Sequence, residues 1–131
     1  MSHGDPDPAP ARGHVVGLDH VQLAMPAGGE ARAEVFYSGI LGLERVPKPE
    51  PLAARGGCWF EGAAVTIHLG VEAGFRPATK AHPALVVEGF VELVDRLEQA
   101  GHAVRPDHER AGVERCYVDD PFGNRIELIA G

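Results

Sequence analysis

The stretch that decides the fold is residues 65–69, Val-Thr-Ile-His-Leu, together with a counterpart near the C-terminus, residues 125–129, Arg-Ile-Glu-Leu-Ile. Both stretches alternate apolar and polar residues, and side chains in a β-strand point to opposite faces with a period of two. Each stretch therefore predicts a strand with one apolar face and one polar face. The polar face carries His68 in the first strand and Glu127 in the second, at matching places in the two patterns.

The correspondence continues upstream, which indicates that the chain contains two copies of one unit. Cys58-Trp59-Phe60 precedes His68 by almost the same interval as Cys116-Tyr117-Val118 precedes Glu127. Two cysteines are too few for a disulfide framework. We interpret them as small core residues at equivalent positions, and a disulfide between them is the alternative.

The first unit spans about residues 17–70 and predicts the element order βαβββ. Its first strand, residues 18–25, places His20 and Gln22 on the polar face. Apolar residues then fall at helical spacing over residues 30–41, and Gly42 is placed to end that helix. Further strands are predicted at residues 43–46, 57–61 and 64–69, with a proline-rich loop at 47–51.

The second unit spans about residues 82–131, after a linker at residues 71–81, and repeats the same order. His82 opens a strand over residues 82–87, at the position that matches His20 in the first unit. A helical apolar stripe follows and ends at Gly101. The remaining strands are predicted at residues 102–105, 114–118 and 125–129.

Helices with one apolar stripe and strands with one apolar face favour an α+β fold, in which helices cover one side of a curved mixed sheet. We expect residues 14–131 to form one domain of this kind. Residues 1–13 contain three prolines and show no periodicity, so we expect a disordered N-terminal arm.

Composition excludes several classes of partner. A net charge of −7 argues against a nucleic-acid or anionic-membrane surface. No apolar run approaches the roughly 20 residues of a membrane span, and no secretion signal is evident. We therefore predict a cytoplasmic protein.

The polar strand face is richer in metal-binding groups than a core surface would be. Four such groups lie on it at matched points of the repeat: His20, His68, His82 and Glu127. Neutral imidazoles and a carboxylate suit a divalent transition metal, with bonds of roughly 2.0–2.2 Å for zinc. We predict a metal site with a position open to water or substrate. The pocket candidates beside it are Gln22, Trp59, Thr66 and Arg125, although core packing is an equal interpretation of Trp59.

These residues resemble a known family, the vicinal oxygen chelate superfamily. It includes glyoxalase I, extradiol dioxygenases, methylmalonyl-CoA epimerase, fosfomycin-resistance transferases and bleomycin-binding proteins. The resemblance covers nearly everything after residue 16. It rests on residues 17–21 (Gly-Leu-Asp-His-Val), Phe36-Tyr37, residues 41–43 (Leu-Gly-Leu) and residues 120–128 (Asp-Pro-Phe-Gly-Asn-Arg-Ile-Glu-Leu).

The resemblance implies that two βαβββ modules curl into a mixed-sheet cup, with helices on the outer face, that holds a metal. His20, His82 and Glu127 match the three recurrent ligands of the family. His68 falls at, or within one residue of, a variable fourth position, where glyoxalase I usually has a glutamate that acts as ligand and proton-transfer base. We therefore assign catalytic roles to His68, as ligand or base, and to Glu127.

The resemblance also implies a function. We expect a glyoxalase-like lyase or isomerase, in which Zn, Ni, Fe, Mn or Co chelates vicinal oxygens of a small substrate and stabilises an enediolate or oxyanion. One alternative is an Fe(II) extradiol-type dioxygenase, because two histidines and one carboxylate also form the triad of non-haem iron oxygenases. The other is a resistance-type protein that sequesters a drug.

We also expect a homodimer. One curled sheet of four strands forms only half a cup, and its exposed edge favours pairing with another module. The linker would allow that module to come from the same chain or from a second one. The resemblance favours a second chain, with His20 and His68 facing the partner's His82 and the partner's Glu127.

Overall fold

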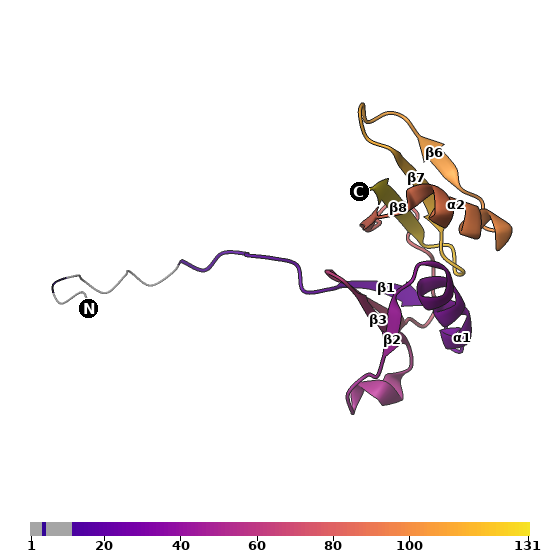
Figure 1. The fold of residues 1–131 in the computed structure, drawn as a ribbon. Coiled ribbons are helices and arrows are strands. Elements are labelled where there is room, and N and C mark those ends of the chain that lie inside the picture. The colour runs from indigo at the N-terminus through magenta and orange to yellow at the C-terminus, as the bar shows by residue number, and fades with distance from the viewer. Residues whose placement is uncertain (1–3, 5–11) are drawn as a thin grey trace.

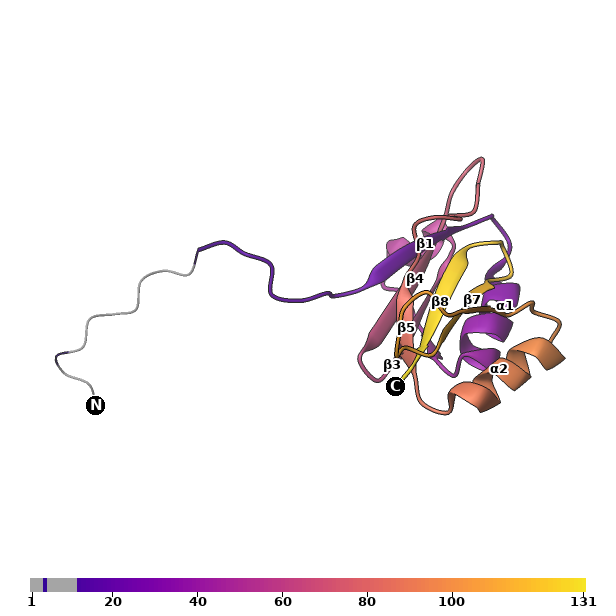
Figure 2. The ribbon, with the colours of Figure 1, turned by 90° about the horizontal axis from the view of Figure 1, so that it is seen from above.

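The computed structural model describes Gly4 and residues 12–131. Most of the arm predicted at residues 1–13 lies outside this part of the chain. Residues 12–20 have no regular secondary structure and are exposed, and Figures 1 and 2 show this segment running away from the two modules. The first strand begins at Val21, slightly later than the sequence predicts.

The first module has the predicted order of elements, with one additional short helix in the proline-rich loop. Its four strands are arranged β1-β4-β3-β2, and β1 is parallel to β4 while the other pairs are antiparallel. Its elements are β1 (Val21–Met25), α1 (Glu30–Ala33), the π-helix η1 (Glu34–Ile40), β2 (Glu44–Val46), the 3₁₀ helix η2 (Leu52–Arg55), β3 (Cys58–Gly62) and β4 (Val65–Val71).

The second module repeats this arrangement, with strand order β5-β8-β7-β6. Its elements are β5 (Ala84–Val87), α2 (Phe90–Gln99), β6 (Arg105–Asp107), β7 (Arg115–Asp119) and β8 (Arg125–Ala130). The strand β6 begins at the last residue of the strand predicted over residues 102–105. The registers of the modules match, because Trp59 lies opposite His68 and Tyr117 lies opposite Glu127.

The apolar faces of both sheets pack against the helices and form the core. Ile67, Leu69, Ile126 and Leu128 are each at most 1% exposed, and they share one buried cluster with helix residues such as Phe36. Figure 2 shows α1 and α2 on the same side of the strands. The predicted α+β class and the helix-covered outer face are thus confirmed, and each sheet is open rather than closed into a barrel.

The first helix changes type along its length. Its α-helical turn ends at Ala33, and the following π-helical segment places Phe36 and Tyr37, which are adjacent in sequence, in the core with no exposed surface. Gly42 follows this helix and Gly101 follows α2, with φ angles of 81° and 88° that favour glycine. Both glycines therefore end helices, as the sequence predicts.

The turn between β7 and β8 connects the two modules. The side chain of Asn124 in this turn donates from Nδ2 to the carbonyl oxygen of Ala24 in β1 at 2.8 Å. Its Oδ1 accepts from the backbone N–H of Ala78 in the linker at 3.0 Å. Asn124 is 1% exposed, so these hydrogen bonds fix the turn, the linker and β1 relative to one another. Within the described residues, no helix is both long and apolar enough to span a bilayer.

Candidate metal centre

Two of the predicted ligands, His20 and His68, lie together on the polar face of the first sheet. His68 is in β4, and the ring of His20, just before β1, stacks on it with 4.2 Å between the ring centroids. The indole of Trp59 in β3 stacks on His68 at 3.9 Å, because the antiparallel register places these residues opposite each other. His68 is consequently only 8% exposed, although it lies on the polar face of its strand.

The environment of His68 favours the neutral imidazole. Burial lowers the pKa of His68, and the nearby His20 lowers it further. The Nδ1 of His20 lies 2.7 Å from a carboxylate oxygen of Asp19, so Nδ1 carries the proton and the lone pair of a neutral ring is on Nε2. A neutral imidazole is the form that binds a metal. A cavity of about 500 Å³ adjoins this pair, and Gln22, Trp59 and Thr66 are among the residues that line it.

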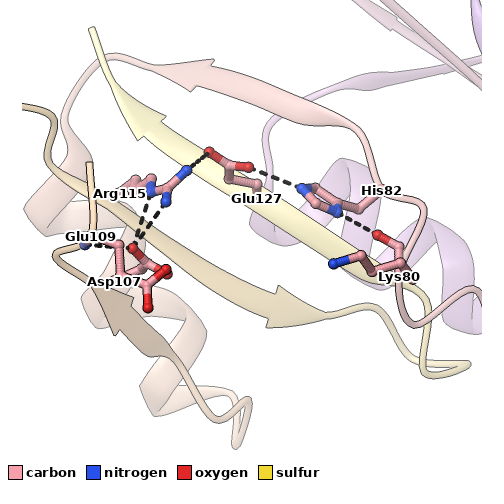
Figure 3. A network of polar contacts seen from close by, with 6 residues as sticks. All are labelled: Lys80, His82, Asp107, Glu109, Arg115 and Glu127. Carbon is pink, nitrogen blue, oxygen red and sulfur yellow. Dashed lines mark hydrogen bonds and ion pairs between the residues drawn. The ribbon is translucent and has the colours of Figure 1, made fainter.

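The other two predicted ligands, His82 and Glu127, form a pair on the second sheet (Figure 3). Nε2 of His82, just before β5, lies 3.0 Å from Oε1 of Glu127 in β8. Nδ1 of His82 lies 2.8 Å from the carbonyl oxygen of Lys80. The Glu127 side chain is 7% exposed, and its other oxygen, Oε2, accepts from Arg115 at 3.2 Å.

The hydrogen bond from His82 to Lys80 makes this pair fit a metal ion. A carbonyl oxygen only accepts, so Nδ1 carries the proton and a neutral His82 directs the Nε2 lone pair at Glu127. An ionised carboxylate also only accepts, so a cation, either a proton or a metal ion, must lie between these atoms. Two ligand atoms bound at right angles to a metal, at roughly 2.0–2.2 Å, are about 3 Å apart. The observed 3.0 Å separation meets this requirement.

The structure brings the four predicted ligands together as two pairs rather than as one cluster. Each pair belongs to one module, and its members lie on the first and last strands of that module or directly beside them. Within residues 12–131 and Gly4, no group of three His, Cys, Asp or Glu side chains is close enough to hold a metal. Each module of a chain thus carries half of the predicted site.

Arg125, the remaining pocket candidate, lies on the second sheet. Its guanidinium carbon is 4.3 Å from the centroid of the Tyr117 ring, on the neighbouring strand β7. Tyr117 also contacts His82, in an edge-to-face arrangement with 5.4 Å between the ring centroids. Arg125 therefore joins Tyr117 and the His82–Glu127 pair on one face, while the other three pocket candidates lie on the first sheet.

Sequence reasoning missed two residues at the second pair, Arg115 and Asp107. The guanidinium of Arg115 bridges Glu127 and Asp107. A signal for Arg115 is present, because β7 alternates Arg115, Tyr117 and Asp119 with the buried Cys116 and Val118. That alternation places Arg115 on the same sheet face as Tyr117. Tyr117 pairs with Glu127 on the neighbouring strand, so Arg115 and Glu127 share this face.

Comparisons with known proteins agree with this architecture. A model of the Glyoxalase/Bleomycin resistance protein/Dioxygenase superfamily matches residues 17–128. The crystal structure of a glyoxalase family protein from Bacillus anthracis is similar, with 48% sequence identity, a TM-score of 0.87, and coverage of 92% of this chain and 99% of that one. No curated protein sequence matches the chain.

More distant solved structures share the fold. The fosfomycin resistance protein FosX from Listeria monocytogenes is 20% identical, with a TM-score of 0.70 and coverage of 90% of this chain and 95% of that one. A virulence protein from Salmonella typhimurium is 21% identical, with a TM-score of 0.68 and coverage of 89% and 98%. These two likenesses concern the fold alone. The family model and the Bacillus anthracis protein together show that the chain belongs to the glyoxalase/bleomycin resistance protein/dioxygenase superfamily.

Proposed function

We propose that the protein is a divalent-metal-dependent enzyme that acts on a small molecule with vicinal oxygen atoms, in a glyoxalase-like lyase or isomerase reaction. The observation that carries this proposal is the geometry of His82 and Glu127. Nε2 of His82 and Oε1 of Glu127 are 3.0 Å apart, which is the spacing of two ligands bound at right angles to one metal ion, and the Lys80 carbonyl faces Nδ1 and so leaves Nε2 as the metal-binding atom. The metal is Zn, Ni, Fe, Mn or Co.

In this proposal the protein residues bind the metal and move a proton. His20, His82 and Glu127 are ligands, and His68 is either a fourth ligand or the base. A bound divalent ion supplies a Lewis acid that polarises substrate oxygens. The lowered pKa of His68, caused first by burial, keeps its ring neutral near pH 7, so it can accept a proton from the substrate. Gln22, Trp59, Thr66 and Arg125 contact the substrate.

We further propose a homodimer in which each site combines the first module of one chain with the second module of the other. Support comes from the separation of the ligands into two pairs and from the open edges of both sheets. The pairs would face each other across an isologous contact and give two equivalent sites. A cytoplasmic location fits the two free cysteines, which persist as thiols in a reducing compartment.

Metal analysis of protein purified without chelators tests the proposal. We expect about one divalent ion per chain in the wild type and none in the His82→Ala, Glu127→Ala double variant. The matched control is His14→Ala, Glu98→Ala, which also removes one histidine and one glutamate, both of them exposed. Stoichiometric metal in the first double variant would refute the proposed centre.

Screening of the metal-loaded protein then identifies the reaction. The panel contains α-keto hemithioacetals, catechols and acyl-CoA epimers. Turnover of a hemithioacetal or an epimer supports the lyase or isomerase reaction, whereas oxygen-dependent cleavage of a catechol would replace it with a dioxygenase reaction.

A further inference from the structure

The guanidinium of Arg115 lies between two carboxylates on the second sheet, as Figure 3 shows. From β7, its Nη1 donates to Oε2 of Glu127 in β8 at 3.2 Å. On the other side, Nη2 and Nε donate to Oδ1 of Asp107 in β6, at 3.0 and 3.3 Å. The side chains of Arg115 and Glu127 are 15% and 7% exposed, so this ion pair is largely shielded from solvent.

Because of this contact, the two carboxylate oxygens of Glu127 have different partners. Oε2 is held by Arg115, while Oε1 faces Nε2 of His82. Asp107 is fixed in turn, because its Oδ1 accepts from the backbone N–H of Glu109 at 2.9 Å. A continuous series of hydrogen bonds therefore runs from Glu109 through Asp107 and Arg115 to Glu127, and it orients the carboxylate from the side opposite His82.

We propose that Arg115 is a positioning residue that presents a single oxygen of Glu127, Oε1, to the divalent ion. The inference rests on the proposed metal centre, and it adds a residue that acts on the metal only through Glu127. By occupying Oε2, Arg115 keeps the carboxylate from binding the ion through both oxygens and so leaves one more coordination position for substrate. Partners of metal-binding side chains typically change metal affinity 10–100-fold when they are removed.

Charge supports an orienting role that includes Asp107. A guanidinium close to a metal ion repels it, which by itself would weaken binding. The carboxylate of Asp107, in contact with two nitrogens of Arg115, offsets that positive charge. Arg115 can therefore orient Glu127 while the Arg115–Asp107 pair adds little net charge beside the site.

The same sheet contains a matched control. Arg105 in β6 and Asp119 in β7 form an ion pair of 2.9 Å, which resembles the Arg115–Asp107 pair in length. Their side chains are 45% and 49% exposed, and Arg105 donates to Asp119 rather than to a predicted ligand. Replacing Arg105 thus removes an arginine and an ion pair from this sheet without changing the contacts of Glu127.

The test measures Co²⁺ binding by titration of the full-length, metal-free protein, with the visible absorption spectrum as a second readout. We expect Arg115→Gln to weaken Co²⁺ binding at least tenfold and to change the absorption band, because the carboxylate is free to rotate and bind through both oxygens. Arg115→Lys should recover part of the affinity, since an ammonium can still contact Oε2. Arg105→Gln should match the wild type in both measurements.

The outcomes separate this inference from the proposed function. If the wild type binds Co²⁺ and Arg115→Gln binds it with the affinity and spectrum of Arg105→Gln, the positioning role is wrong and the metal centre stands. If the wild type binds no Co²⁺, both proposals fall. Should Arg115→Gln fail to fold, Asp107→Asn decides: it keeps the shape of the side chain, and we expect it to weaken binding severalfold, whereas unchanged affinity overturns the inference.

Discussion

The hydroxyl of Tyr37 donates a 2.7 Å hydrogen bond to Oδ2 of Asp120 and so joins the helix of the first module to the turn of the second. Both residues are buried, with exposed fractions of 0% and 4%. Burial raises the pKa of Tyr37, and the charge and hydrogen bond of Asp120 raise it further. The turn that carries much of the family resemblance is therefore a structural connection between the two modules.

Replacing Tyr37 with phenylalanine should lower the unfolding free energy by about 1.5–3 kcal/mol, the usual contribution of a hydrogen bond to a charged group. The carboxylate of Asp120 would keep three donors: the backbone N–H groups of Phe122 and Asn124, and Nδ2 of Asn124. Urea denaturation of metal-free protein measures the loss. The control Ser38→Ala, one residue away, should stay within about 0.5 kcal/mol of the wild type. Equal stabilities of the two variants would contradict this assignment.

Truncations of Leu128 and His68 compare the apolar face of one sheet with the polar face of the other. Leu128 is 1% exposed in the core, so Leu128→Ala should cost roughly 2–5 kcal/mol. On the polar face of the first sheet, His68→Ala removes the stacking with Trp59 and His20 and should cost about 0.5–1.5 kcal/mol. Thermal unfolding without metal compares them. A His68→Ala variant that melts as early as Leu128→Ala would mean that the polar face is the main core.

The two cysteines should be unreactive in the folded protein. Cys58 and Cys116 are at most 2% exposed, and burial raises the pKa of each thiol to about 11. Thiolates are the reactive form, so iodoacetamide at pH 8 should modify neither residue until urea unfolds the chain. Mass spectrometry counts the modified cysteines. Rapid alkylation of either residue in native protein would contradict the packing described for both strands.

The same pKa shift predicts a loss of stability in alkali. In the unfolded chain the thiols ionise near their ordinary pKa of 9.0, whereas in the fold they stay protonated to about 11. The unfolded state therefore binds fewer protons between these values, and the unfolding free energy falls as the pH rises from 9 to 11. A Cys58→Ala, Cys116→Ala variant should show a smaller fall over this range.

Mixed dimers test whether the metal site is shared between chains. His20→Ala and Glu127→Ala chains, which should each lack the site alone, are unfolded together and refolded. In a shared arrangement, the first module of the Glu127→Ala chain meets the second module of the His20→Ala chain, and each heterodimer regains one intact site. Metal analysis of purified heterodimers gives the answer. Heterodimers without metal would exclude the shared site.

Alternation of apolar and polar residues made much of the fold predictable. It identified the apolar faces of the strands that carry His68 and Glu127, and the matched intervals before these two residues predicted two copies of one unit. The structure has two such modules with equivalent registers, in which Cys58 lies opposite Leu69 and Cys116 lies opposite Leu128. Such patterns are local, because each buried position in a strand requires an apolar side chain and each exposed position allows a polar one.

Other features depend on contacts between distant residues and left no local pattern. The π-helical segment Glu34–Ile40 has the same apolar spacing as an ordinary helix, and its geometry meets the need to bury Phe36 and Tyr37 together. His68 is buried because the pairing of β3 with β4 places Trp59 opposite it, where the indole stacks on the imidazole. The sequence places Arg115 on the same face as Tyr117. Its contacts with Asp107 and Glu127, however, depend on β7 lying between β6 and β8 in the sheet.

The division of the four ligands between two sheets has a consequence for how the protein would hold its metal. In the proposed shared site the ion joins two chains, so metal binding and dimer formation are thermodynamically linked. The apparent metal affinity would then rise with protein concentration, and dilution would release the ion. A cell could thus regulate how much of this protein is metal-loaded through the amount it synthesises, even at a constant supply of metal.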